Sequence, residues 1–440
     1  MFVRSFAVAI CGLSFIFIAD SQAQDNTNRI FFDTVVTGYV QPRKIGVEEM
    51  KYIGATYISA ADSTIMQYAT GVVQRDLDFY SEFDLVTIDS FYLRTYEIKE
   101  LDMLGWARLG ADYLVRLEAE FPGSKLRVRW RLFDTSPEQE ISKGTLENDR
   151  FAWRTVAHQI SNEIVRYLTG DQGPFLTQIA YVRKMGKAKE IFVADYDGAN
   201  ERQVTKTGST NLSPTFSPDG SEIYFTSFLD GQPHLYKVSA EGGKPVKVAG
   251  FSGIVAAPAI SPDGNQIACV LSKDGNSEIY IIDKQGNVVR RLTNHRSIDT
   301  SPTWSPDGKM MAFTSDRSGS PQVYIMDTYG NGVRRLTPEG DYNDSPIWSA
   351  KGNRVTFVSR TPRGRFDLAS IDTSGEGYRI LTDLGTNENP HFSPDGKQII
   401  FSSTRLGTGD LFTADLSGRN QRRLTRTGDC SNPTWGPLRY

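Results

Sequence analysis

The sequence predicts a multidomain chain in which an N-terminal α/β domain is followed by an all-β six-bladed β-propeller closed by the C-terminal strand. Two observations predict the propeller: a motif that recurs every 44 residues, and two incomplete repeats that complete each other. A third observation, the helical spacing of apolar residues before residue 170, predicts the α/β domain.

Composition excludes several classes of function. The 440 residues include 49 basic and 52 acidic side chains, a formal net charge of −3. This balance argues against nucleic-acid binding, which needs a basic face. Hydrophobic residues make up 39% of the chain, enough for a buried core. With only 4 His and 3 Cys, neither a His- or Cys-rich metal site nor a disulfide framework is expected.

Residues 1–23 have the layout of an export signal. Arg4 supplies a positive start, an apolar run follows over residues 6–19, and Ser21 and Ala23 are small residues at the −3 and −1 positions of a cleavage site. The run is shorter than the ~20 residues that a membrane-spanning helix requires, which favours cleavage after Ala23 over a permanent anchor. The mature protein is therefore expected to be exported and soluble.

Residues 24–170 are expected to form the α/β domain. Apolar residues over 65–77 share one face of a helix, with Asp62 or Ser63 as the expected N-cap. A second helix is expected over about residues 96–109, followed by a glycine stop. A third carries apolar residues at helical spacing over 156–168 and ends at Gly170.

Two strands are expected between the second and third helices. Residues 113–115 and 126–132 are rich in β-formers and flank a Pro-Gly-Ser turn. The second strand alternates apolar residues with arginines, so the arginines should face water. The alternating arginines are Arg127, Arg129 and Arg131.

A Ser-Pro-Asp-Gly motif organises the second half of the chain. Its copies begin at Ser217, Ser261, Ser305, Ser349 and Ser393, 44 residues apart each time, and the fourth copy is degenerate. Pro, Asp and Gly suit a tight turn, so a structural role is expected for them. Each period also holds β-rich runs separated by Gly turns, which amounts to four short strands. Four strands in 40–45 residues is the size of one propeller blade.

The ends of the repeat region predict how the ring closes. Residues 179–205 hold the last three strands of a blade, and residues 433–437 hold a first strand with nothing after it. Pairing the two fragments gives six blades over residues 175–440, joined to the first domain by a linker at 170–175. Closure removes sheet edges that would otherwise promote aggregation.

The sequence shows no catalytic constellation. It contains no nucleophile elbow, P-loop, metalloprotease or dinucleotide motif. His234, His295 and His391 fall at different positions of the repeat and should not meet, and His158 is expected to cap or pack on the third helix. Cys269 lies in an apolar strand, where a small buried hydrophobe is the expected role. No catalytic residue, cofactor or metal site is therefore predicted.

The segments just before each inner strand vary among the repeats. In a propeller the innermost strand begins near the mouth of the central channel, so six such segments should surround that mouth with small and acidic groups. The acidic ones are Asp299, Asp344 and Glu388. Each segment alone reads as an ordinary turn, but as a ring they are the best candidate binding site, because binding commonly uses loops on a rigid scaffold.

Three segments outside the repeats carry a family resemblance. They are Trp106 with Gly110-Ala111-Asp112-Tyr113-Leu114-Val115, the run from His158 to Ile164, and the linker region from Leu168 to Val182. Together they resemble the TolB family, the periplasmic component of the Tol–Pal envelope system. The Pro-Asp-Gly repeats alone would be weak support, since many exported propellers have them.

The resemblance implies a non-enzymatic periplasmic scaffold that takes part in outer-membrane integrity and cell division. It implies two partners: the peptidoglycan-associated lipoprotein Pal at the propeller mouth, and the inner-membrane protein TolA at the N-terminal strand. By position in the repeat, the implied Pal-binding residues are Ala257, Thr300, Ser301, Ser345 and Asn389. The implied TolA-binding residues are Arg29, Ile30, Phe31, Phe32 and Asp33.

The same resemblance implies a monomer that meets the membranes only through its protein partners and needs no cofactor. An alternative stays open from the sequence. The chain would then be an exported β-propeller enzyme or a glycan-binding protein that shares only the repeat with the TolB family.

Overall fold

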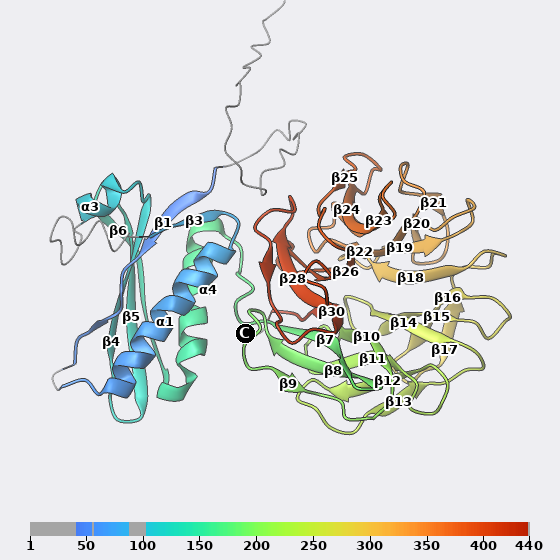
Figure 1. Ribbon diagram of the computed structural model, residues 1–440, viewed down its shortest axis with the longest axis horizontal. Coiled ribbons are helices and arrows are strands. Elements are labelled where there is room, and N and C mark those ends of the chain that lie inside the picture. Colours follow the sequence, from blue (N-terminus) through green and yellow to red (C-terminus); the bar gives the residue numbers. More distant parts are fainter. Residues whose placement is uncertain (1–40, 55–56, 88–102, 439–440) are drawn as a thin grey trace, which may run out of the picture. The chain divides into compact units, whose positions relative to one another are not determined.

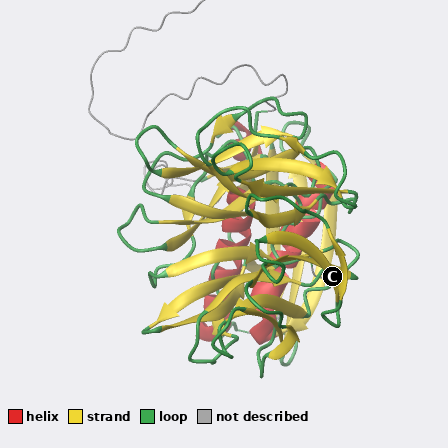
Figure 2. Ribbon diagram, turned by 90° about the vertical axis from the view of Figure 1, so that its right-hand side faces the viewer, coloured by secondary structure: helices red, strands yellow, loops and turns green. Residues whose placement is uncertain are grey.

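The computed structural model describes residues 41–54, 57–87 and 103–438, and the chain from Pro42 onward forms one compact unit. The prediction of an α/β domain followed by a six-bladed propeller is confirmed (Figure 1). Within the described residues, helices occur only in the first domain, and the propeller consists of strands and loops (Figure 2). The expected export signal and the expected TolA-binding strand at residues 29–33 lie outside the described residues.

One six-stranded mixed sheet forms the framework of the α/β domain. Its strands are β1 (Arg43–Val47), β2 (Lys51–Tyr52), β3 (Phe83–Val86), β4 (Tyr113–Glu120), β5 (Lys125–Asp134) and β6 (Gln139–Asp149). The order is β3-β1-β4-β5-β6, with β2 beside β4. The strands expected around residues 113 and 126 are confirmed as β4 and β5. Strand β6 was not expected, because its polar sequence buries few side chains.

Two long helices cover one face of this sheet, where Figure 1 shows them side by side. These two are α1 (Ala60–Phe79) and α4 (Trp153–Thr169). The domain also has a short helix, α3 (Met103–Arg108), and a 3₁₀ turn, η1 (Arg150–Ala152). The other face carries Arg127, Arg129 and Arg131, which are at least one-third exposed and pair with glutamates, as the alternation predicts.

The helix ends agree with the sequence in one case and correct it in another. Helix α4 ends at Gly170 as predicted, with a left-handed φ of 77°. Helix α1 begins earlier than expected: Ser59, not Asp62 or Ser63, is the N-cap, and its Oγ accepts a hydrogen bond from the Asp62 amide at 3.1 Å. Residues 96–102 of the second expected helix lie outside the described residues, and α3 is its described part.

Each propeller blade is a four-stranded antiparallel sheet. Five blades run in chain order: β10 (Asn211–Phe216), β11 (Glu222–Ser227), β12 (His234–Ser239), β13 (Val246–Ala249); β14 (Val255–Ile260), β15 (Gln266–Leu271), β16 (Glu278–Asp283), β17 (Val288–Arg291); β18 (Asp299–Trp304), β19 (Met310–Ser315), β20 (Gln322–Asp327), β21 (Arg334–Arg335); β22 (Asn343–Trp348), β23 (Arg354–Arg360), β24 (Phe366–Asp372), β25 (Arg379–Ile380); β26 (Asn387–Phe392), β27 (Gln398–Ser403), β28 (Asp410–Asp415), β29 (Arg422–Arg423).

The sixth blade closes the ring as the sequence predicts. Its innermost strand is the C-terminal β30 (Cys430–Trp435), and the other three are β7 (Gln178–Met185), β8 (Ala188–Asp195) and β9 (Arg202–Gln203). Strand β30 pairs antiparallel with β7, with Trp435 opposite Ile179. The two ends of the repeat region are thereby joined by backbone hydrogen bonds.

Aromatic residues at one position of the second strand fill the space between blades. Phe225, Phe313, Phe357 and Phe401 are fully buried and lie 44 or 88 residues apart, and each contributes about 2–3 kcal/mol by leaving water. Cys269 occupies the same position in the β14–β17 blade and is 0% exposed. This confirms its prediction as a small buried hydrophobe, and burial raises the pKa of its thiol to about 12.

The Ser-Pro-Asp-Gly turns are built by side chain-to-backbone hydrogen bonds. In the first copy, Ser217 Oγ accepts from the Glu222 amide at 3.0 Å, and Asp219 accepts from the Ser221 amide at 3.0 Å. The hydroxyl of Ser217 and the Ser221 groups hold the pKa of Asp219 at about 2. The degenerate copy keeps the turn through Gly352, whose φ is 79°. These residues have the structural role that the sequence predicts.

The α/β domain packs on the propeller through the C-terminal end of α1. The Phe79 carbonyl accepts from Gln398 Nε2 at 3.1 Å, and the Phe79 ring lies 5.3 Å from that of Tyr196 in the sixth blade. A buried polar cluster lies beside these rings: Asp76 accepts from the Tyr196 hydroxyl at 2.5 Å and lies 2.8 Å from His158 Nδ1. His158 therefore packs at the junction, in line with its expected packing role.

Candidate functional site

The six inner strands share one irregularity near the mouth of the central channel. In each, the register with the neighbouring strand shifts at the residue that precedes the proline, which marks a β-bulge. That residue has a left-handed φ between 47° and 54° in all six strands. The six residues are Ser213, Ala257, Ser301, Ser345, Asn389 and Asn432.

This conformation is costly for a residue with a Cβ atom. A left-handed φ costs roughly 1–2 kcal/mol outside glycine, and a following proline restricts the backbone further. The six residues are all small or Asn, the types that tolerate the conformation best. The same conformation at six equivalent places in one ring makes the mouth a candidate functional site, since backbone strain concentrates at functional sites.

The structure brings the predicted Pal-binding residues together at this ring. Four of them occupy bulge positions, and Thr300 lies one residue before the bulge of β18; all five are partly exposed. Ser213 and Asn432 complete the ring, although the family resemblance assigned neither to a partner. The 44-residue register reaches Ser213, and the last copy, one residue shorter, reaches Asn432, whereas no sequence signal showed the bulge.

The acidic groups expected at the mouth divide into two kinds. Asp344 and Glu388 are accessible there, and Asp344 accepts hydrogen bonds from the Thr314 hydroxyl at 2.8 Å and the Tyr342 hydroxyl at 3.2 Å. Partial burial and the Asp344 carboxylate raise the pKa of Glu388. The expectation was wrong for Asp299, which is 0% exposed and pairs with Arg317 of its own blade.

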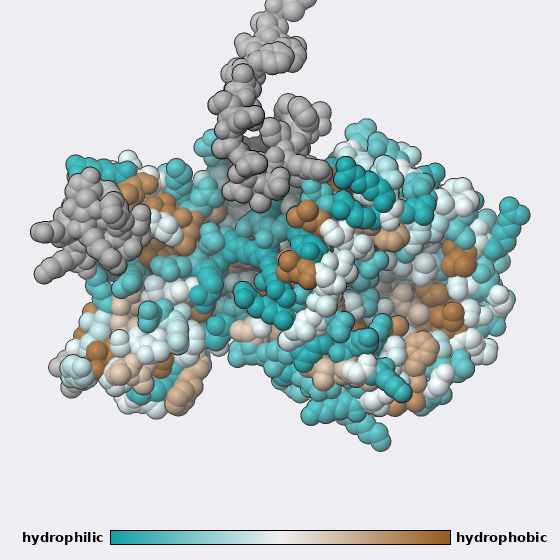
Figure 3. Space-filling view, in the orientation of Figure 1, coloured by the Kyte–Doolittle hydropathy of each residue, from teal (hydrophilic) through white to brown (hydrophobic). Residues whose placement is uncertain are grey.

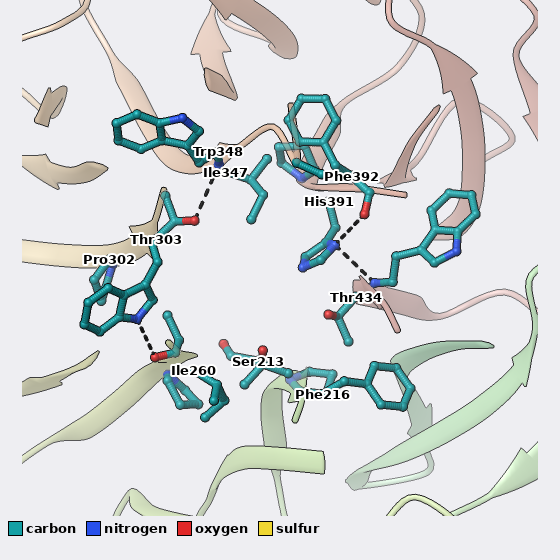
Figure 4. Close-up of a pocket in the computed structure, with 18 of the residues that line it drawn as sticks. Ser213, Phe216, Ile260, Pro302, Thr303, Ile347, Trp348, His391, Phe392 and Thr434 are labelled. Atoms are coloured by element: carbon teal, nitrogen blue, oxygen red, sulfur yellow. Dashed lines mark hydrogen bonds between the residues drawn. The ribbon is translucent and has the colours of Figure 1, made fainter. Parts of the chain in front are cut away.

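Below the ring, the inner strands enclose a cavity of about 420 Å³. Figure 4 shows Ser213, Ile347, His391 and Thr434 pointing into it. Burial lowers the pKa of His391 to about 4, so its imidazole is neutral at physiological pH. His391 Nδ1 lies 3.2 Å from the Trp435 amide of the next blade, much as Thr303 Oγ1 accepts from the Trp348 amide at 3.4 Å.

The described side chains outside the channel offer no candidate metal centre. Over the described part of the chain, no group of three or more His, Cys, Asp or Glu side chains is arranged to hold a metal ion. Hydrophobic side chains on the propeller face seen in Figure 3 form small, separate patches. None of the described helices is long and apolar enough to cross a membrane.

Comparison with known proteins decides the family. Residues 165–439 match the TolB beta propeller domain, and residues 34–141 match the TolB amino-terminal domain. The chain belongs to the TolB family. The match of both domains also tells against an unrelated propeller that shares only the repeat.

Relatives of the TolB family resemble this chain in sequence and in structure. "Tol-Pal system protein TolB" of Nitrosomonas europaea is 37% identical over 190 residues, 42% of this chain and 44% of that protein. The protein of the same name from Ruegeria sp. is 30% identical over 245 residues, 53% of each chain. The aligned part of the chain thus spans about half the length of these curated relatives.

A crystal structure of TolB from Acinetobacter baumannii is similar over more of the chain. It has a TM-score of 0.77 at 27% identity and covers 91% of this chain and 98% of that one. The likeness therefore extends over both domains of this TolB-family protein.

Proposed function

We propose that this protein is a non-enzymatic periplasmic scaffold of the Tol–Pal system that binds Pal at the propeller mouth. The ring of six bulges carries this proposal, because it presents six strained, partly exposed backbone segments on one rigid surface. The proposed Pal contacts are Ala257, Thr300, Ser301, Ser345 and Asn389.

The surroundings of the ring suit a protein partner. Apolar side chains in loops before the inner strands, and in loops between the second and third strands, are 37–59% exposed. They are Phe228, Leu229, Ile254, Ile298, Leu384 and Leu406. Neither Asp344 nor Glu388 forms an ion pair with a cation among the described residues, so both carboxylates are available to a basic group. An apolar rim around a few directional polar groups is typical of protein recognition sites.

We propose that the N-terminal segment, residues 29–33, binds TolA. Two separate contacts on one molecule would link an outer-membrane lipoprotein to an inner-membrane protein, as outer-membrane integrity and cell division require. We propose no catalytic step: the imidazole of His391 faces a channel of small side chains and has no acid or nucleophile as a partner among the described residues.

A double substitution at the ring tests the Pal contact. Thr300→Arg with Ala257→Asp introduces two large charged groups at the mouth, and Asp tolerates the left-handed φ of position 257. We expect the affinity for purified Pal, measured by calorimetry, to fall at least about tenfold, which corresponds to about 1.4 kcal/mol.

The matched control places the same charges on outer strands. Val246 and Val289 are 57% and 48% exposed, so Val246→Asp with Val289→Arg should leave Pal affinity and thermal stability unchanged. Unchanged affinity in the mouth variant would place the interface elsewhere. Turnover of a glycan or peptide without Pal binding would favour the enzyme alternative.

A further inference from the structure

Three seams between neighbouring blades are held by the same buried hydrogen-bond arrangement. A side chain at the start of the third strand accepts from a threonine hydroxyl and from an asparagine amide that begins the next blade. In the first seam, Glu190 Oε2 accepts from Thr205 Oγ1 at 2.6 Å and from Asn211 Nδ2 at 3.0 Å. Asn343 and Asn387 donate in the same way to Gln322 and Asp367, both at 2.8 Å.

The seam between the β14–β17 and β18–β21 blades departs from this arrangement. Glu278 takes the acceptor position, but Asp299 stands where the other seams have asparagine. The Asp299 amide donates to the Ser277 carbonyl at 3.0 Å, which places Asp299 beside the start of β16, where Glu278 lies, and both acidic residues are 0% exposed. Because an ionised aspartate cannot donate, Glu278 Oε2 is left buried without a hydrogen-bond partner.

Two arginines neutralise the pair from opposite sides. Arg317 donates to both oxygens of Asp299, at 2.9 and 2.8 Å, and Arg291 donates to Glu278 Oε1 at 3.2 Å. The backbone amide of His295 also donates to Glu278 Oε1, at 2.9 Å, while the ring of His295 accepts from the Ser297 amide. Asp274 lies 3.6 Å from the far side of Arg291 and 3.0 Å from Lys273.

These contacts leave one buried acceptor, Glu278 Oε2, without a donor. Both cations are engaged by oxygens other than Glu278 Oε2, and a buried acceptor without a donor costs about 1–3 kcal/mol. Burial, together with the charge of Glu278, raises the pKa of Asp299 even though Ser315 and Arg317 oppose the shift. A proton on the pair would supply the donor that asparagine supplies elsewhere.

We infer that Glu278 and Asp299 form a proton-binding site in this seam, with one proton shared between the two carboxyl groups. The proton replaces the asparagine N–H of the other seams and bridges the adjacent strands β16 and β18. Asp299 is followed directly by Thr300, so protonation acts on the strand that carries a proposed Pal contact. Only this consequence for partner binding rests on the proposed function.

The direction of the pH dependence follows from linkage. A carboxyl group whose pKa is raised on folding contributes most stability when protonated and loses it as pH rises through the raised value. The seam is therefore strongest below the ordinary aspartate pKa of about 3.9 and weakens as pH rises through the raised pKa. Replacing Asp299 by asparagine would provide a permanent donor and remove this dependence.

Asp299→Asn in the full chain is the first test, and the seam at Asn387 shows that it suits an arginine neighbour. There Arg405 donates to Asn387 Oδ1 at 2.9 Å and to Ser403 Oγ at 2.8 Å, as Arg317 does to Asp299 and Ser315. At about pH 7.5 we expect the variant to unfold about 2 °C or more above the unaltered protein. This difference in unfolding temperature should become smaller as the pH is lowered to about 5.

The reverse substitution provides the matched control. Asn387→Asp would place a second carboxyl beside Asp367, which should lower the unfolding temperature near neutrality and restore it on acidification. Difference infrared spectra provide a direct reading: at about pH 5 the carbonyl band of a protonated carboxyl should be lost in Asp299→Asn. These measurements need no partner, so they remain decisive if Pal does not bind.

Two results would overturn the inference. One is an equal loss of stability at both pH values in Asp299→Asn, which would show that Asp299 is ionised and contributes only its ion pair with Arg317. The other is an Asn387→Asp variant that does not recover on acidification. If the inference holds and Pal binds, the ratio of Pal affinities at the two pH values should change in Asp299→Asn.

Discussion

An acidic side chain is buried and fully hydrogen-bonded at the junction between the two domains, whereas two at the mouth of the propeller are accessible and without a cation among the described residues. At the junction, Asp76 is 1% exposed and both of its oxygens are used, by His158 and by the Tyr196 hydroxyl. At the mouth, Asp344 and Glu388 remain accessible and have no cation among the described residues.

The difference shows where polar groups contribute to stability and where they remain available for binding. A buried carboxylate is tolerated only with partners, and losing them is costly. An accessible carboxylate without a cation costs little in the unbound molecule and keeps its capacity for a partner. The strained left-handed bulges of the inner strands likewise lie at the mouth, where binding is proposed, and not at the junction.

The largest effect that this comparison predicts is at Asp76. Asp76→Ala would leave His158 and the Tyr196 hydroxyl buried without their acceptor, and we expect a loss of about 3–5 kcal/mol in the free energy of unfolding. Urea denaturation measures it. Asp84→Ala, at an exposed aspartate of β3, is the control and should change stability by no more than about 0.5 kcal/mol. Similar losses in the two variants would contradict the distinction.

A smaller effect is expected from pH at the same junction. Burial alone would lower the pKa of His158, but the charge and hydrogen bond of Asp76 more than offset it, so the pKa is raised. A raised histidine pKa contributes stability that is complete below the unfolded value of about 6.5 and is lost as pH rises through the folded value.

Urea midpoints measured between about pH 6 and pH 9 should therefore fall with rising pH more steeply in the unaltered protein than in His158→Gln. Each unit of pKa shift corresponds to about 1.4 kcal/mol. Parallel slopes in the two proteins would show that His158 is neutral in the folded state.

The smallest expected effect is at the mouth itself. Ala257→Gly relieves a left-handed φ of 49° and should leave the protein unchanged or more stable by up to about 1 kcal/mol. Ala259→Gly, two residues along the same strand and not at a bulge, should instead lose about 0.5–1 kcal/mol. Thermal unfolding of the two variants compares them directly, and a loss in both would mean that the bulge stores no strain.

Much of the fold was predictable because the repeat is a local signal. The 44-residue spacing, the turn chemistry of Ser217 and Asp219, and the incomplete end repeats specify six blades and the pairing of β30 with β7. The candidate ring was predictable for the same reason, since equivalent positions in a closed ring must lie at the same level. Strand β6 and the Ser59 cap were missed because their signals are weak or shared with neighbouring residues.

The sequence by itself determined the architecture, since hydrophobic period, turn residues and repeat length act between residues close along the chain. Only the tertiary structure decided which groups are buried against which. Asp299 looked like a mouth residue but lies in a seam, and His158 meets its partners on α1 and in the sixth blade. Partners distant along the chain set the burial and charge of such groups, and no local pattern records them.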